Sequence, residues 1–237
     1  MRVLLTFFLI LPSLVLAQTL TLAVDPWPPF TDKNGKGVAT EVVRAALKRG
    51  GTTLKTVDVP WDKAWEGSVA GRYDGVLAVW FDADRARALQ FSEPYMLNRL
   101  VMVVRNKDVD VIKSLSDLAG RKVGVVKGYS YHPEFDAAEN FPRVESASLS
   151  GSMVKLAAGK VEVVVDSEVA IEYWMRRNPK SAKQVKILPD ALGERALYIA
   201  LNRSSPETDK TMAHFNAALK EMQADGSLRK LLHSAAK

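Results

Sequence analysis

Short apolar runs alternate with longer segments of helical period along most of this chain. In a first series the expected strands lie at 19–24, 53–59 and 75–80, and they are followed by helical patterns at 38–49 and 62–70 and a short turn at 83–88. Strands and helices in this order are typical of parallel sheets that are covered by helices on both faces. The chain is therefore expected to be an α/β protein.

A second series of the same kind begins at the apolar run 100–104. It predicts strands at 122–126, 143–147, 161–166 and 185–188, helices near 133–139, 149–158 and 167–177, and a capped segment at 114–120. A strand at 197–202 follows, then a long helix with Met212, Phe215, Leu219 and Met222 on one face, and a last helix after Gly226. Two series predict two lobes, each a mostly parallel sheet flanked by helices.

The first seventeen residues have the pattern of a secretory signal. One Arg precedes an unbroken apolar run, and the small residues Val15 and Ala17 predict cleavage before Gln18. The sequence contains no cysteine, which excludes disulfides and a lipid-bearing Cys at the cleavage point. We therefore expect a soluble periplasmic protein that is not a lipoprotein.

Composition excludes several other classes of function. The chain is 47% hydrophobic and 25% charged, which is typical of a folded protein. Its Lys and Arg residues are dispersed, whereas a nucleic-acid interface would need them clustered. The three histidines have no metal-ligand spacing and no Gly-rich phosphate loop occurs, so we expect no metal, no cofactor and no nucleic-acid partner.

Aromatic and charged residues follow the ends of several expected strands. The stretch DPWPPF after the first strand holds Asp25, Trp27 and Phe30 between prolines that restrict the backbone. Trp61, Trp80, the loop KGYSYHP and Asp166 follow later strands. Ligands of open α/β sheets bind beyond the carboxyl ends of strands, so we interpret DPWPPF as a binding platform. The alternative is a surface turn whose rings cover the core.

These residues belong to a longer series of motifs. The series comprises DPWPPF and the stretches 73–95, 114–131, 156–174 and 217–232. It resembles the bacterial extracellular solute-binding proteins of family 3, the periplasmic receptors of polar amino-acid importers. The resemblance implies a two-lobed fold of the type II periplasmic binding proteins, with lobe 1 at 18–97 and 196–237 and lobe 2 at 98–195. It places a two-segment hinge near 96–99 and 194–197.

The resemblance also implies roles for individual residues. Arg85 would grip the α-carboxylate of a ligand, assisted by Ser130 in the loop that Gly128 opens, and Asp166 would take the α-amino group. Arg85 and Asp166 are expected on opposite lobes of an open, solvated cleft. From the residues alone, Arg85 could instead pair with Asp82 or Asp84. Asp166 could instead cap the next helix.

The stretch 78–84 departs from the family pattern. Family members usually carry Ser and Thr hydroxyls there, whereas this chain reads AVWFDAD and is one residue shorter. Trp80 would then present a flat apolar wall to the ligand, while Trp61 faces the crevice or packs with Trp65 in the core.

The leading hypothesis is a monomeric receptor, without catalytic residues, for an amino-acid-like or carboxylate solute delivered to an ABC permease of the inner membrane. The alternatives are a lyase similar to cyclohexadienyl dehydratases, with Glu168 as the acid, and a ligand sensor that acts through a partner chain.

Overall fold

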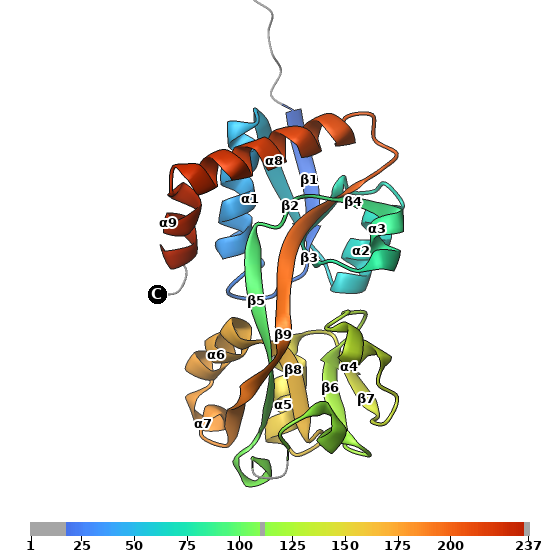
Figure 1. The fold of residues 1–237 in the computed structure, drawn as a ribbon, viewed down its shortest axis with the longest axis vertical. Coiled ribbons are helices and arrows are strands. Elements are labelled where there is room, and N and C mark those ends of the chain that lie inside the picture. Colours follow the sequence, from blue (N-terminus) through green and yellow to red (C-terminus); the bar gives the residue numbers. More distant parts are fainter. Residues whose placement is uncertain (1–17, 110–111, 235–237) are drawn as a thin grey trace, which may run out of the picture.

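The protein has two lobes stacked along its long axis (Figure 1). The structure is a computed structural model and describes residues 18–109 and 112–234. The expected signal segment lies outside these residues. A mixed sheet runs through both lobes in the order β2-β1-β3-β9-β5-β8-β6-β7, with β4 paired to β9.

Lobe 1 is built on three parallel strands, of which β1 is the central one. These strands are β1 (Gln18–Val24), β2 (Thr52–Asp58) and β3 (Gly75–Trp80), and the short strand β4 (Leu89–Phe91) pairs with β9 rather than with them. The helices of this lobe are α1 (Val38–Arg49), α2 (Trp61–Val69), α3 (Ala83–Ala88), α8 (Thr208–Ala224) and α9 (Ser227–Ser234). The expected strands and helices of the first series all form, and β4 was not anticipated.

Lobe 2 repeats the arrangement with β6 between β7 and β8, all three parallel. The strands are β6 (Val123–Val126), β7 (Arg143–Ser146) and β8 (Val163–Ser167). The α-helices are α4 (Pro133–Ala137), α5 (Leu149–Ala157), α6 (Glu168–Arg177) and α7 (Pro179–Ala182). Two short 3-10 turns, η1 (Asn106–Asp108) and η2 (Leu115–Leu118), complete the lobe. The expected capped segment is η2, where Ser114 and Asp117 form a capping box.

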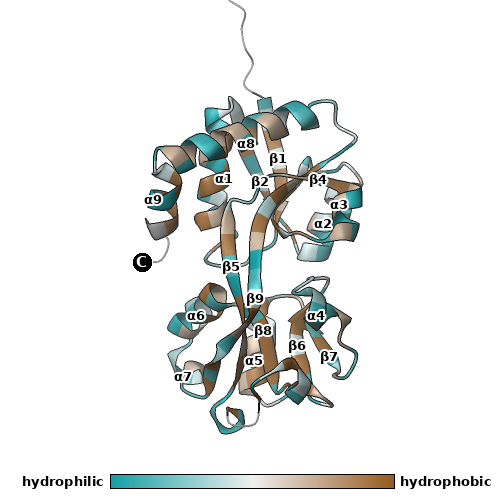
Figure 2. Ribbon diagram, viewed as in Figure 1, coloured by the Kyte–Doolittle hydropathy of each residue, from teal (hydrophilic) through white to brown (hydrophobic). Residues whose placement is uncertain are grey.

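Two long antiparallel strands, β5 (Met96–Arg105) and β9 (Val185–Asn202), run from one lobe into the other. The sequence predicted two separate strands at 185–188 and 197–202, and this was wrong because β9 is continuous. The intervening residues 189–196 are exposed or half-buried, since the hinge strands have no helix layer to bury them, and Figure 2 shows the part of β9 between the lobes as hydrophilic. Met96 pairs with Leu197 and Arg99 with Glu194. The proposed lobe boundaries fall inside this paired stretch and stay a prediction.

The core follows the sheet through both lobes. Buried aliphatic side chains on both faces of the strands pack against the apolar sides of the flanking helices. Met212, Phe215, Leu219 and Met222 of α8 are all buried, as their spacing predicted. None of the helices in the part of the chain that the structure describes has the length and apolar character needed to cross a membrane.

Candidate functional site

The DPWPPF loop leaves β1 at the level where the two lobes meet. Its shape is fixed locally: the backbone N–H of Trp27 donates to the Thr31 hydroxyl, which itself donates to the Asp25 carbonyl. Trp27 is only 5% exposed and Phe30 is buried beside it, with ring centroids 4.3 Å apart. The loop is thus a rigid, buried element of the contact between lobes, and its role as a platform for a ligand stays a prediction.

Asp166, at the end of β8, is held by lobe 1. Trp27 Nε1 donates to its Oδ1 at 2.9 Å, and the backbone N–H of Ser167 donates to the same oxygen. The side chain is 0% exposed, so the expectation of a solvated cleft was wrong for this residue. Burial raises the pKa of Asp166 to about 7. Ser167, not Asp166, is the residue that precedes helix α6.

A second acid, Asp25, lies in the same contact. Tyr129 of lobe 2 donates its hydroxyl to Asp25 Oδ2 at 2.6 Å. Burial raises the pKa of Asp25 to about 6, although the Tyr129 hydrogen bond partly opposes this shift. Burial also holds the pKa of the Tyr129 hydroxyl well above its usual range. Two acids from different lobes therefore lie in one apolar environment, each bonded to an aromatic side chain of the opposite lobe.

Aromatic rings from both lobes fill the crevice between these acids and Arg85. Trp80 contacts Trp27 and Tyr129 with ring centroids 5.2 and 5.5 Å apart, and Trp61 lies 5.7 Å from Tyr129. The rings meet edge to face, a favourable packing geometry. The cavity that remains is about 10 Å³, barely enough for one water. In this arrangement the lobes are closed and the crevice is occupied by the protein itself.

Arg85 of α3 lies at the edge of this crevice. Its guanidinium is 5.0 Å from the Trp61 ring centroid, and it donates to the Gly128 carbonyl of lobe 2 at 2.8 Å and to the Trp80 carbonyl at 3.4 Å. Asp82 caps α3 through backbone N–H groups, and Asp84 pairs with Arg87. Arg85 forms no ion pair with the carboxylates of residues 18–109 and 112–234. Arg85 is therefore not paired with Asp82 or Asp84, and this alternative was wrong.

The loop after β6 carries the expected Gly128 and Ser130. Gly128 has φ +75°, and a Cβ there would approach Trp61 Cδ1 to 3.1 Å, so the close contact with lobe 1 requires glycine. The Ser130 hydroxyl donates to Asp136 and Asp82, and the backbone N–H of Tyr131 donates to Asp136 Oδ1. The Asp136 carboxylate thus accepts from the Ser130 hydroxyl, which was expected to assist Arg85 in holding a ligand carboxylate. The expected helix there is also shorter and ends at Ala137.

Sequence reasoning missed several residues of this contact. Tyr129 was not selected because tyrosines are common as half-buried packing residues, and Asp136 belongs to no motif that marked it. Arg195 of β9 donates to the Phe81 carbonyl, next to the carbonyl that Arg85 contacts, and had no local signal because it lies in the polar hinge. No group of three or more His, Cys, Asp or Glu side chains within the described residues is arranged to hold a metal ion.

Comparisons with known proteins give a consistent assignment. The profile of the bacterial extracellular solute-binding proteins, family 3, matches residues 20–234. The arginine-binding extracellular protein ArtP of Bacillus subtilis is 28% identical over 217 residues, covering 86% of this chain and 80% of the relative.

Solved structures agree in fold. An ancestral arginine-binding protein bound to arginine has a TM-score of 0.79 at 26% identity, covering 91% of this chain and 97% of that one. An ancestral amino-acid-binding protein, described as a precursor of cyclohexadienyl dehydratase, has a TM-score of 0.76 at 25% identity, with coverages of 92% and 95%.

Proposed function

Because this chain belongs to the bacterial extracellular solute-binding proteins of family 3, we propose that it captures an amino-acid-like or carboxylate solute between its two lobes. The solute would bind in the crevice between Arg85 and Asp166. ArtP is named as an arginine-binding protein, and the ancestral protein was solved with arginine bound. Both support an amino-acid-like ligand.

One observation carries this proposal. A guanidinium without an ion pair lies on one lobe, and a carboxyl oxygen without a hydrogen-bond partner lies on the other. Arg85 of lobe 1 bonds only carbonyl oxygens and has no ion-pair partner among the described residues. Asp166 of lobe 2 has a buried Oδ2 without a hydrogen-bond partner in the same part of the chain. A zwitterion offers a carboxylate for the planar guanidinium fork and an ammonium for the free carboxylate oxygen.

Binding in the crevice requires the lobes to open first. The cavity of about 10 Å³ cannot hold an amino acid, so the Trp27–Asp166 and Arg85–Gly128 contacts must be exchanged for contacts with the solute. Asp166 and Arg85 then bond to the other lobe when the crevice is empty and to the solute when it is bound. A ligand shifts this equilibrium only by its differential affinity for the two states.

The cellular role follows the family. We place the mature protein in the periplasm after cleavage of its signal, as a monomer without a cofactor that passes its solute to an inner-membrane ABC permease. A sensor role would use the same capture step and differ only in the partner chain.

The lyase alternative depends on Glu168 as an acid in the crevice. Glu168 Oε1 instead accepts from Arg99 Nη1 at 2.7 Å, and Arg99 also donates to the Pro189 carbonyl at the hinge. This ion pair holds the Glu168 carboxylate at the hinge strands, and Glu168 is not among the residues that line the crevice. This contact supports the receptor over the lyase.

The test begins with mass spectrometry of the solute that co-purifies from the periplasm, followed by calorimetry. Arg85→Ala is expected to weaken binding by about 2–5 kcal/mol, roughly thirty-fold to several-thousand-fold. Asp166→Asn should weaken a zwitterion but leave a plain carboxylate unchanged or tighter. Arg87→Ala, in the same helix and ion-paired to Asp84, is the matched control. Unchanged binding by Arg85→Ala contradicts the proposal.

A further inference from the structure

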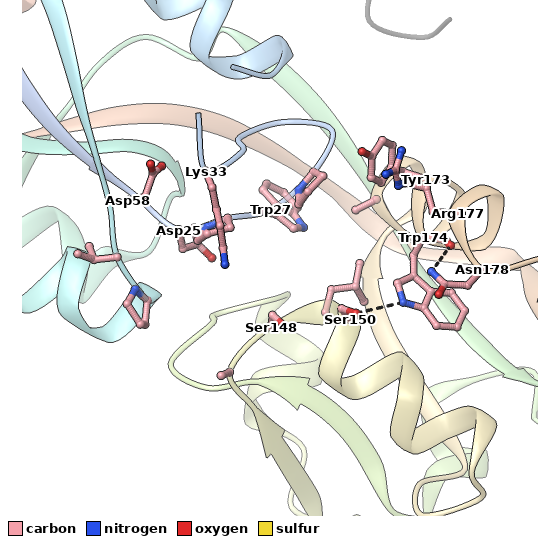
Figure 3. Close-up of a pocket in the computed structure, with 17 residues that line it drawn as sticks. Asp25, Trp27, Lys33, Asp58, Ser148, Ser150, Tyr173, Trp174, Arg177 and Asn178 are labelled. Atoms are coloured by element: carbon pink, nitrogen blue, oxygen red, sulfur yellow. Dashed lines mark hydrogen bonds between the residues drawn. The ribbon is translucent and has the colours of Figure 1, made fainter. Parts of the chain in front are cut away.

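A second space lies between the lobes, beside the filled crevice. This side groove has a volume of about 810 Å³ and shares Trp27 with the crevice as a wall (Figure 3). Its lobe 1 wall consists of the DPWPPF loop, Lys33 and the segment 58–60. Its lobe 2 wall consists of the start of α5 and one side of α6. The groove is present while the lobes are closed, so it is accessible in the state where the crevice is not.

The middle of the side groove is apolar and rigid. Pro26, Trp27 and Pro28 form one wall, and Trp174 lies in the other. The Trp174 indole is buried and its Nε1 donates to Ser150 Oγ at 3.3 Å, while Asn178 Nδ2 donates to the backbone carbonyl of Trp174 at 2.8 Å (Figure 3). Proline rings and a fixed indole lose little conformational entropy when a flat apolar group packs between them.

The charges of the groove are divided between its walls. Both acids, Asp25 and Asp58, lie on the lobe 1 wall together with Lys33. Among the described residues that line the lobe 2 wall none is acidic, and this wall carries Arg177. Arg177 is exposed, and its guanidinium lies 5.9 Å from the Tyr173 ring centroid. Arg177 has no ion pair within the described part of the chain, whereas its neighbour Arg176 pairs with Glu172 at 3.9 Å.

We propose that the side groove binds an aromatic carboxylate. The ring lies between the proline wall and Trp174, and the carboxylate points to Arg177 and the serine hydroxyls at the start of α5, away from Asp25 and Asp58. A cationic amine is disfavoured at the lobe 2 wall by the charge of Arg177. This site is separate from the proposed solute crevice, because Arg85 does not line it and the lobes need not open.

The test uses phenylacetate as the probe and the indole N–H signals of the five tryptophans as the readout. These signals are assigned with single Trp→Phe variants. We expect phenylacetate to shift the Trp174 signal with millimolar affinity, whereas phenethylamine, which carries the opposite charge, does not. Shifts confined to Trp61, or equal binding of phenethylamine, overturn the proposal.

Variants of two adjacent arginines distinguish a direct contact between Arg177 and the ligand carboxylate from a general effect of positive surface charge. Arg177→Ala is expected to weaken phenylacetate binding about threefold to fivefold, the upper part of the range of an exposed charge contact. Arg176→Ala removes the same charge one residue away, outside the groove, and should leave the affinity within twofold. Both residues are exposed, so both variants should fold. Equal effects of the two variants, or no effect of Arg177→Ala, contradict the site.

Discussion

The crevice and the side groove share Trp27 as a wall, yet one is filled and the other is open. On the crevice side the rings of Trp80 and Tyr129 lie against Trp27 and leave about 10 Å³. On the groove side the same loop faces a space of about 810 Å³. Aromatic residues at strand ends can therefore serve either to close a site or to line one.

The two regions also differ in how exposed their charged side chains are. The contact between the lobes buries Asp166 and also Asp25, which borders the groove, against aromatic partners, and this burial raises the pKa of both carboxyls. The groove keeps Lys33 and Arg177 exposed. Substitutions in the crevice should therefore change stability and its pH dependence, whereas substitutions of exposed groove residues should mainly change the affinity for the groove ligand.

The largest expected effect comes from the shared wall. Trp27→Ala should lower the free energy of unfolding by about 3–5 kcal/mol, because it removes a buried ring from contacts with four aromatic or polar partners. Tyr173→Ala, a half-buried ring on the groove side, should cost about 1 kcal/mol or less. Urea denaturation of both variants measures the contrast. Equal losses would mean that the crevice is no better packed than the groove.

The next effect concerns pH. The folded state keeps the Asp166 proton up to a pKa of about 7, whereas the ordinary value is 3.8. Folding therefore takes up a proton between these values, and this residue's contribution to stability falls as pH rises from about 4 to about 7 and is level above that. Asp166→Asn should remove about 2–3 kcal/mol of the stability difference between pH 5 and pH 8.

The matched control for this pH effect is Asp58→Asn on the groove wall, an exposed acid. Burial raises the pKa of Asp58 as well, but the residue is exposed, so its variant should change the pH profile in the same direction and by less than Asp166→Asn. A profile for Asp166→Asn that also coincides with the wild type would show that Asp166 is ionised in the folded protein at pH 5, which contradicts a pKa raised by burial.

A smaller effect is expected from the Tyr129 hydroxyl. Tyr129→Phe removes the donor to Asp25 and leaves a buried carboxylate oxygen without it, at a cost of about 1–3 kcal/mol. The pKa of Asp25 should rise further above about 6, because this hydrogen bond lowers it. Carbon-detected NMR titration of the Asp25 carboxyl measures the shift. A lower pKa in the variant would contradict the contact.

The smallest effect is predicted at the groove rim. Lys33→Ala should change the free energy of unfolding by no more than about 0.5 kcal/mol, because the side chain is exposed and makes no ion pair within the described residues. Thermal unfolding measures this directly. A loss above about 1 kcal/mol would mean that the groove wall depends on Lys33 for its structure.

Much of the fold was predictable from periodicity alone. The helix 38–49 and the strand 75–80 match the expected bounds because their apolar spacing is local and their core faces are well defined. The continuous β9 was not predictable, since its hinge stretch is paired only to β5 and buries little apolar surface to leave a pattern. The three-residue β4 is too short to carry any period.

The proximity of several candidate site residues was predictable from the sequence, whereas their closed packing was not, and their role in ligand binding stays a prediction. Strand-end positions selected Trp27, Trp80 and Asp166, and the family resemblance selected Arg85. The structure brings these residues into one contact between lobes. How these side chains pack depends on the sizes of aromatic rings from segments far apart in the sequence, and no single segment predicts it. For the same reason, the Asp25–Tyr129 and Asp136–Ser130 bonds had no signal in sequence.

Binding in the crevice needs the lobes to open, whereas binding in the side groove does not. Asp62 and Lys127 form a weak ion pair across the lobes at 3.9 Å, and the chain has no cysteine, so Asp62→Cys and Lys127→Cys can be bridged cleanly by a short bismaleimide. Calorimetry should then show that the bridged protein no longer binds the solute recovered from the periplasm but binds phenylacetate as the unbridged protein does. Undiminished binding of that solute by the bridged protein would contradict the need for opening.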